Sequence, residues 1–565
     1  MFLEIIRCLL VFTLLSIGLA WPLAAKLPLS AVEKLVASLV LSLVALWLFG
    51  WTLYTWTLSW SLLWLLPPLA AAGLIWRRRE LVALLRDPIA GTYLWSQLLV
   101  SLWTLGWLSL VQNYSGGGWT GDWFEHWERA LFFLNRQPAD HLFLGIYPLT
   151  ARPPLGNVIM AVWLHLTQVD FPHYQLFSTL LGSLAFLPAA LLAARWGGNC
   201  TTVVVLAVLF MVNPLFVQNS VFPWTKLPSA LFVLTALYFF LRFRDGTSPR
   251  TSALLCSTAL AAGLLTHYSA APYVLALALG WSMLRPTDWR RLEFLRITAL
   301  AAGAGAVLLA TWFGWAFATY GITGTLATST SVTTTAADAG GQLWRVLLNL
   351  RDTLVPHFLR SPDPALIAQT SPWGYARDWF FQVYQLNLFL ALGSTGWLVV
   401  LREAWRLWPV SAPAARGFWA GFATVTGLLG VAVHGARDEW GLTHICLQPL
   451  VLLGLAFFAT RWASLGRGWR CVATVGAVFD LICGIGLHFA VQNFAFDRCL
   501  TPSRKAWDVL TSYNPQTLAN VFGLARNHLV TLNESLNQPP LLVLALLAAL
   551  LLLALWQWHT SSSAR

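Results

Sequence analysis

The stretch GTYLWSQLLVSLWTLGWLSLVQ, residues 91–112, is predominantly apolar and contains no charged side chain. A helix needs about 20 such residues to cross the hydrocarbon core of a bilayer. Similar runs recur through the 565-residue chain, which is 58% hydrophobic and 10% charged. These runs are continuously apolar and do not alternate, so a β-barrel is excluded and each run must satisfy its own backbone groups as a helix. The sequence therefore predicts an all-α, polytopic transmembrane helical bundle.

We expect roughly 15 spans in this bundle. Before residue 91, the run at 5–24 is predicted to be a retained first span rather than a cleaved signal peptide, and 31–76 is long enough for two crossings. The later predicted spans are 174–194, 201–219, 228–242, 252–267, 270–284, 294–318, 381–401, 417–434, 442–460, 471–490 and 541–558.

The positive charge of the chain indicates its orientation rather than a nucleic-acid partner. The net charge is +12, but the Lys and Arg residues are spread through short loops and form no basic domain. Four arginines between residues 77 and 86 precede the span at 91–112, which predicts a cytoplasmic loop there and an outer location for residues 113–173. The segment 155–168 is too short to cross, and if it lies along the outer surface, every later basic loop falls inside. This assignment gives three large outer segments, 113–173, 319–380 and 491–540.

The outer segment 113–154, NYSGGGWTGDWFEHWERALFFLNRQPADHLFLGIYPLTARPP, is polar and rich in carboxylates. An amphipathic surface helix is expected over 123–136, with Glu125, Glu128 and Arg129 opposite its aromatic face. Asp122 stands at the N-cap of this helix, and Glu125 three positions later has the spacing of a capping box. A carboxylate fixed at the membrane boundary also has the chemistry to take a proton from an acceptor hydroxyl, and the two interpretations are compatible.

Two cations are predicted on the same outer side. Arg152 precedes a rigid Pro-Pro pair and can grip a phosphate with its two-pronged guanidinium, although an arginine that reaches the lipid headgroups is the alternative. Lys226, in a very short outer loop, runs against the positive-inside trend, which suggests that it faces an anionic group. One carboxylate with two cations suits the activation of a hydroxyl together with the departure of a phosphate, as in sugar transfer from a lipid phosphate.

At these residues the chain resembles GT-C glycosyltransferases of the protein O-mannosyltransferase and aminoarabinose transferase superfamily, the family 39 and 83 type. Asp122 resembles the carboxylate motif of that family, and Arg152-Pro153-Pro154-Leu155 resembles its second motif. The resemblance implies a seven-span glycosyltransferase module at 91–318, preceded by extra spans at 1–90. An outer loop at 319–380 and carboxyl-terminal spans at 381–565, with the outer loop 491–540, would follow.

The resemblance also implies a polyprenyl-phosphate-linked sugar donor, an inverting mechanism, no obligatory metal or other cofactor, and a bacterial inner membrane as the location. Asp122 would be the general base, with Glu125 as a second catalytic candidate, although the family's usual Asp-Glu pair is Asp122-Trp123 here. Arg152 and Lys226 would bind the lipid phosphate, and His126 and Glu128 would contact the substrate. The acceptor is a glycan, a lipid or a protein. A further polar loop could line the same cavity or simply be solvated; it contains His434, Arg437, Asp438, Glu439 and His444.

A polytopic transporter or lipid flippase is the main alternative. Such proteins place ionisable residues within their spans, and the sequence offers Asp480 with His267 and His488 near span ends. A membrane scaffold without enzymatic activity is the third class, but it gives no reason for the set Asp122, Arg152 and Lys226. The seven cysteines are scattered without a CxxC pair, so no metal site or disulfide framework is indicated.

Overall fold

The computed structural model describes residues 2–111, 122–145, 147–283, 290–328, 341–360, 372–433 and 441–494. Over these ranges the chain is helical, with one isolated β-bridge between Phe143 and Tyr147. The amino-terminal elements are α1 (Phe2–Gly18), α2 (Trp21–Ala24), α3 (Ala31–Thr55), η1 (Trp60–Leu65), α4 (Leu66–Trp76) and α5 (Arg78–Arg86). The predicted all-α class is confirmed.

The central part of the chain contains α6 (Pro88–Leu108), α7 (Asp122–Asn135), η3 (Leu149–Ala151), α8 (Leu155–Leu166), α9 (Phe171–Ser183), α10 (Phe186–Arg195), α11 (Cys200–Val212), α12 (Pro214–Val221), α13 (Lys226–Arg244), α14 (Pro249–Thr266), η4 (Tyr268–Ala270), α15 (Ala271–Ser282) and α16 (Leu292–Leu326). The carboxyl-terminal part contains α17 (Gly341–Leu354), η6 (His357–Leu359), α18 (Pro372–Leu386), η7 (Leu390–Leu392), α19 (Gly396–Leu407), α20 (Pro413–Val433), η8 (Thr443–Leu447), α21 (Gln448–Arg461), η9 (Trp462–Ser464), α22 (Arg467–Phe479), η10 (Asp480–Gly486) and α23 (Leu487–Phe494).

Six helical runs in the described ranges are long and apolar enough to cross a membrane, and a seventh is added if the bent pair α11–α12 counts as one span. The six runs are Ala31–Thr55, Phe171–Arg195, Lys226–Arg244, Leu292–Leu326, Thr443–Ser464 and Arg467–Gln492. The chain is therefore an integral, multi-pass membrane protein. The expected total of roughly 15 spans is not confirmed by this count, and the predicted span at 541–558 lies outside the described residues.

Helix starts follow the cap chemistry of the sequence. The Asp87 carboxylate accepts a hydrogen bond from Ile89 N at 2.9 Å at the start of α6, and Asp170 accepts one from His173 N at 2.9 Å at the start of α9. Both helices carry proline in the first turn, where its missing N–H costs nothing. Asn213 opens α12 in the same way, since its side chain accepts from Phe216 N at 2.9 Å.

Two predicted spans are broken. The run 201–219 bends by 69° between α11 and α12, because Asn213 is extended and Pro214 cannot continue the first helix. The run 381–401 is not one helix, so that prediction was wrong: α18 ends at Leu386 and α19 begins at Gly396. Within the break, the Asn387 side chain accepts from two backbone N–H groups at 3.0 Å, and Gly393 has φ +97°, which glycine alone adopts readily.

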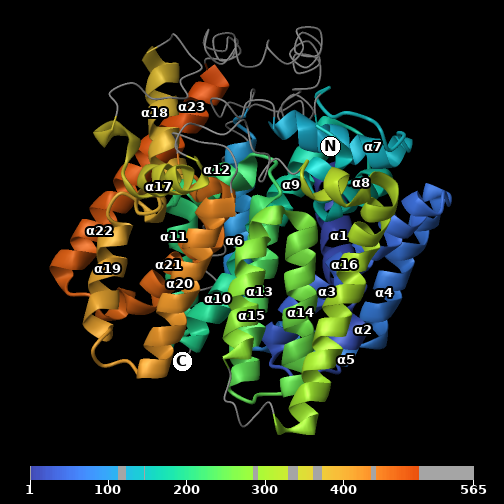
Figure 1. The fold of residues 1–565 in the computed structure, drawn as a ribbon, viewed down its shortest axis with the longest axis horizontal. Coiled ribbons are helices and arrows are strands. Elements are labelled where there is room, and N and C mark those ends of the chain that lie inside the picture. Colours follow the sequence, from blue (N-terminus) through green and yellow to red (C-terminus); the bar gives the residue numbers. More distant parts are fainter. Residues whose placement is uncertain are drawn as a thin grey trace.

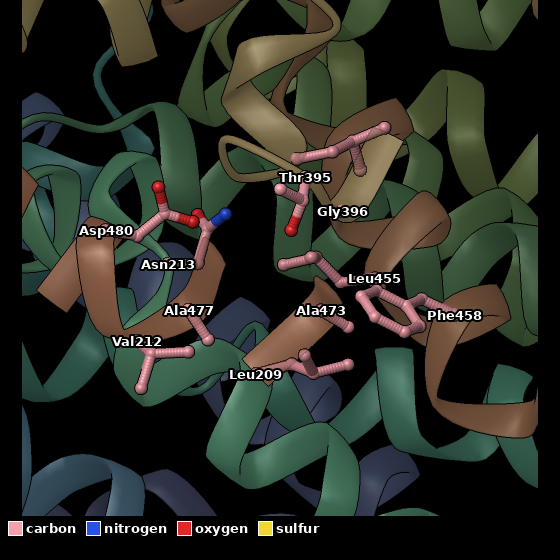
Figure 2. A pocket seen from close by; sticks show the side chains of 11 residues that line it. Leu209, Val212, Asn213, Thr395, Gly396, Leu455, Phe458, Ala473, Ala477 and Asp480 are labelled. Atoms are coloured by element: carbon pink, nitrogen blue, oxygen red, sulfur yellow. The ribbon is translucent and has the colours of Figure 1, made fainter. Parts of the chain in front are cut away.

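Asp480 holds this break in place. Its carboxylate accepts hydrogen bonds from the Tyr384 hydroxyl at 2.8 Å and from Ser394 N at 3.0 Å. The residue begins η10, a short π-helical turn between α22 and α23. Figure 2 shows Asp480 and Asn213 along the wall of a cavity of about 20 Å³, which is room for roughly one water molecule. The ionisable residue within this predicted span therefore has a packing role.

The amino-terminal spans pack against the central helices through a buried carboxylate. Glu33 completes a capping box with Ser30 at the start of α3. Its other oxygen accepts hydrogen bonds from the Tyr238 hydroxyl and the Arg242 guanidinium of α13. Residues 31–76 form α3, which is long enough to cross a membrane, and then the shorter apolar segment η1–α4, so the expected second crossing in this stretch is not confirmed.

One long helix joins a basic loop to the segment around η3. In Figure 1, α7, α8 and α9 lie at the upper end, whereas α2 and α5 lie at the lower end. The long helix α16 begins directly after Arg290 and Arg291 and ends against η3, where the Thr150 hydroxyl donates to Gly324 O at 2.9 Å. A basic loop and the segment around η3 thus lie at opposite ends of one helix.

Helix α8 differs from the expectation that the segment 155–168 lies along the outer surface. It has 12 residues, about 18 Å of helix, which is too short to cross a bilayer. All of its residues except His165 are buried, because α3, α7, α9 and α14 surround it. The segment is therefore enclosed by protein, and its apolar composition reflects burial on all sides.

Candidate functional site

The first turn of α7 brings Asp122 into contact with residues that are distant in sequence. Its carboxylate accepts a hydrogen bond from Trp224 Nε1 at 3.0 Å and lies 3.5 Å from Arg152 Nη2. Trp224 stands just before α13, and Arg152 follows η3. Three segments of the chain therefore meet at this carboxylate, whose side chain keeps 19% of its surface exposed.

Glu125 lies one turn further along α7 and is fully buried between two arginines. Arg152 donates to it from Nε at 2.9 Å and from Nη2 at 2.9 Å, and Arg129 donates from Nε at 2.8 Å. The sequence predicted that Glu125 and Arg129 lie on the solvent-exposed polar face of a surface helix. That prediction was wrong, because both residues are 0% exposed. The partner that buries them, Arg152, comes from a segment 27 residues later.

Arg129 fixes the loop that leads to Arg152. Its guanidinium donates to Leu149 O at 3.0 Å and to Pro148 O at 3.1 Å, and it lies over the Phe143 ring at 4.1 Å. The first of these bonds satisfies a buried carbonyl group, whereas Pro148 O also accepts from Ala151 N at 3.0 Å. The ion pair between Arg129 and Glu125 therefore positions η3 and, with it, Arg152.

The two carboxylates have opposite pKa shifts. Burial raises the pKa of Asp122, and the charges of Arg152 and Lys226 offset only part of that effect. Burial acts on Glu125 in the same direction, but Arg152 and Arg129 overcome it and lower its pKa to about 2. Asp122 is accordingly the stronger base of the pair, and Glu125 stays ionised as the counterion of the arginines.

Lys226 is linked to Asp122 by the Trp224 side chain, which contacts both residues. It is the first residue of α13, it is 5% exposed, and its Nζ lies 3.9 Å from the centre of the Trp224 ring. The same indole donates to Asp122 through its Nε1. The structure thus brings Asp122, Arg152 and Lys226 together, and the Lys226 charge acts on the Asp122 carboxylate.

His126 lies beside this set, whereas Glu128 is held elsewhere. His126 Nδ1 is 3.3 Å from Asn157 Oδ1 of α8. Burial and the charge of Arg152 lower the pKa of His126 to about 3, so its ring is neutral. Glu128 accepts from Leu144 N at 2.9 Å and contacts His141 at 3.3 Å, which ties it to the loop after α7.

Several residues of the site carry no sequence signal. Trp224, Asn157 and Arg129 were not predicted, since a tryptophan among 33 or an asparagine in an apolar run does not stand out. His444 belongs to the polar loop that was expected either to line the same cavity or to be solvated; its ring centre lies 5.5 Å from that of Trp224. The other residues of that polar loop, His434, Arg437, Asp438 and Glu439, lie outside the described residues.

The site combines a proton acceptor with cations that can hold an anion. Arg152 uses Nε and Nη2 for Glu125 and Asp122, and its side chain keeps 10% of its surface exposed. A guanidinium has five N–H donors, so donors remain for a phosphate oxygen. In the part of the chain that the structure describes, no group of three His, Cys, Asp or Glu side chains is placed to hold a metal ion.

Comparison with known proteins gives a distant structural similarity. The fold is similar to two crystal structures of ArnT from Cupriavidus metallidurans. The apo structure is 16% identical over 82% of this chain and 74% of that chain, with a TM-score of 0.44. The structure bound to undecaprenyl phosphate is 12% identical over 79% of this chain and 78% of that chain, with a TM-score of 0.46. No family model and no curated protein matches the sequence.

Proposed function

We propose that this protein is an integral membrane glycosyltransferase. It moves a sugar from a polyprenyl-phosphate-linked donor to an acceptor hydroxyl on the extracytoplasmic side of a bacterial inner membrane. The observation that carries the proposal is the meeting of Asp122 with Arg152 at 3.5 Å and, across the Trp224 indole, with Lys226. The sequence resemblance at Asp122 and at Arg152-Pro153-Pro154-Leu155 supports the same chemistry.

The reaction is a direct displacement at the anomeric carbon of the sugar. Asp122 takes the proton of the acceptor hydroxyl while that oxygen forms a bond to the anomeric carbon. The bond between this carbon and the phosphate oxygen breaks, and its electron pair stays on the phosphate. Attack from the face opposite the leaving phosphate inverts the configuration. Because phosphate is a good leaving group, the reaction needs no general acid.

Arg152 and Lys226 stabilise the departing phosphate. Charge builds up on the phosphate oxygens as the bond breaks, and fixed cations in a largely buried site are most effective at that moment. Arg152 is held in position by Glu125, which itself stays ionised. In this proposal Glu125 positions Arg152, and Asp122 is the base. His126 and Glu128 remain proposed substrate contacts, and the acceptor is a glycan, a lipid or a protein.

The orientation follows from the charge of the loops. α13 runs from Lys226 to Arg244 over 19 residues, so along the helix axis Lys226 lies about 24 Å from Arg242 and about 27 Å from Arg244. The positive-inside rule assigns the arginine-rich ends to the cytoplasm. The reaction would therefore take place on the opposite side.

A test of the function uses the purified full chain in lipid vesicles with undecaprenyl phospho-sugars that carry a labelled hexose or pentose. We expect label to pass to an acceptor hydroxyl and undecaprenyl phosphate to be released. Lipid mass spectrometry of cells without the protein should show accumulation of one lipid-linked sugar. Movement of a lipid or solute across the vesicles without sugar transfer would instead establish the transporter or flippase alternative.

Trp224→Phe is expected to lower the transfer rate about tenfold, because it removes a hydrogen bond to a charged carboxylate and keeps an aromatic ring under Lys226. The bond from Trp224 lowers the pKa of Asp122, so its loss raises that pKa. The low-pH decline of kcat/KM should then move to higher pH. A pH–rate profile measures this shift.

Trp163→Phe is the matched control for this substitution. Trp163 is buried in α8, and its Nε1 has no hydrogen-bond partner among the described residues. The control should leave the pH profile in place. An unchanged profile in Trp224→Phe would show that the indole does not tune Asp122.

A further inference from the structure

Three polar side-chain atoms next to the site are buried without a hydrogen-bond partner among the described residues. They are His126 Nε2, Asn157 Nδ2 and Thr225 Oγ1. The three residues are 1%, 1% and 8% exposed. Folded proteins leave few buried polar groups unpaired, because each one forfeits the hydrogen bonds it makes with water in the unfolded chain. These three lie on segments that contact one another next to the site, so their hydrogen-bonding capacity is available to a ligand bound there.

The three residues belong to segments that contact one another: α7, α8 and the residue that precedes α13. His126 of α7 contacts Asn157 of α8, with 3.3 Å between Nδ1 and Oδ1. Gly156 lies against Thr225: a Cβ at this glycine would be only 3.1 Å from Thr225 Cγ2. Glycine at this position therefore lets the start of α13 approach the start of α8.

Thr225 connects this group to the reacting carboxylate. Its neighbours in sequence are Trp224, which donates to Asp122, and Lys226, whose Nζ lies over the Trp224 ring. On the α7 side, His126 follows Glu125, which binds Arg152. The unpaired atoms thus lie beside the proposed general base and the proposed phosphate-binding cations.

The hydrogen-bonding character of the group is mixed and uncharged. With Asn157 Oδ1 as acceptor, His126 Nδ1 carries the proton and Nε2 offers a lone pair on a neutral ring. Asn157 Nδ2 is a donor, and the Thr225 hydroxyl both donates and accepts. A phosphate only accepts hydrogen bonds and an isoprenoid chain makes none. Hydroxyl groups both donate and accept, so they match all three atoms.

We infer that Asn157 and Thr225, together with His126, bind hydroxyl groups of the transferred sugar and thereby help to select it. This inference rests on the proposed function, and it adds Asn157 and Thr225 as residues that determine specificity. It separates recognition into two parts: Arg152 and Lys226 hold the phosphate, and this group holds the sugar.

The test compares binding of two kinds of lipid to the purified full chain. One is undecaprenyl phosphate, and the other is a panel of undecaprenyl phospho-hexoses and phospho-pentoses. Thr225→Val and Asn157→Leu keep the approximate shape of the side chains and remove their hydrogen-bonding atoms. We expect each to weaken binding of the preferred sugar lipid about tenfold or more and to leave binding of undecaprenyl phosphate unchanged.

Two further variants serve as controls. Thr235→Val removes a hydroxyl of α13 that already donates to Leu231 O at 2.8 Å, and it should not change the preference for the sugar lipid. Thr225→Ser keeps the hydroxyl and should retain most of that preference. Thermal unfolding of every variant in detergent separates a binding effect from misfolding.

Two outcomes would overturn the inference. In the first, Thr225→Val and Asn157→Leu keep the wild-type preference for the sugar lipid. In the second, they lose binding of undecaprenyl phosphate to the same extent, which would make the residues structural or phosphate-binding. A different result affects the proposed function: if the wild-type chain neither prefers a sugar lipid over undecaprenyl phosphate nor transfers sugar, the glycosyltransferase proposal fails, and this inference fails with it.

Discussion

Asp122→Asn is expected to reduce sugar transfer about a thousandfold, within the range that general base catalysis contributes. Asparagine keeps the size of the side chain and can still accept the hydrogen bond that Trp224 Nε1 donates at 3.0 Å. It cannot take a proton from the acceptor hydroxyl. Binding of undecaprenyl phosphate should remain, because Arg152 keeps its contacts with Glu125. Transfer from a labelled undecaprenyl phospho-sugar measures the first effect, and lipid binding measures the second.

The pH dependence gives a second signature of the same residue. A base must be deprotonated, so kcat/KM of the wild-type chain should fall as the pH decreases through the pKa of Asp122. Burial raises that pKa, so the fall should begin above the region near pH 3.9 where an ordinary aspartate titrates. In Asp122→Asn, kcat/KM should be low at every pH and should not fall as the pH decreases through this range.

Glu125→Gln is the matched comparison for the base assignment. The pKa of Glu125 is lowered to about 2, so this carboxylate is a weak proton acceptor near neutral pH. Its loss should affect transfer less than Asp122→Asn does, and mainly through a higher KM for the donor, because a neutral amide with one acceptor oxygen holds Arg152 less firmly than the carboxylate does. If Asp122→Asn retains full turnover, or if Glu125→Gln rather than Asp122→Asn removes the low-pH decline of kcat/KM, Asp122 is not the base.

The charge pattern made the principal site residues predictable. In a chain with 10% charged residues, Asp122, Arg152 and Lys226 stand out on segments that the positive-inside rule places on one side. The structure brings these three residues together. The helices that pack around these three residues were less predictable, since a pattern of apolar runs does not indicate which helices are neighbours.

The burial of Glu125 and Arg129 shows why local patterns were misleading. On a helical wheel these residues form the polar face of an amphipathic helix, and a solvated face is the usual interpretation. Here the polar face is covered by η3 and by Arg152. The break between α18 and α19 was missed for a similar reason. Asn387 and Gly393 signal a turn, but the surrounding apolar residues favoured one continuous span.

Arg152→Ala is expected to have the second large effect, on both stability and donor binding. Removing one partner of a buried ion pair typically costs about 3–5 kcal/mol, because the other charge is left without compensation. Here Glu125 would keep only Arg129, and Asp122 would lose its nearest cation. Loss of the phosphate contact should weaken binding of undecaprenyl phosphate about a hundredfold, in the range found for hydrogen-bonded charge pairs.

A second substitution separates these two effects. In the double variant Arg152→Ala with Glu125→Ala, the unpaired carboxylate is gone, so part of the stability should return. Binding of undecaprenyl phosphate should stay weak, since no guanidinium has been restored. Thermal unfolding in detergent and lipid binding, measured on the same preparations, give the two results independently.

Arg152→Lys distinguishes a phosphate-binding arginine from one that merely reaches the lipid headgroups. Lysine keeps the charge but has no planar fork, so it cannot bind Glu125 through two nitrogens and a phosphate oxygen at the same time. We expect binding between that of the wild type and that of Arg152→Ala. An arginine that only reached the headgroups would tolerate lysine without loss, and that result would remove Arg152 from the phosphate site. The side chain is 90% covered and is held by Glu125 at 2.9 Å, so its guanidinium is fixed before any lipid arrives, which is the reason to expect a loss.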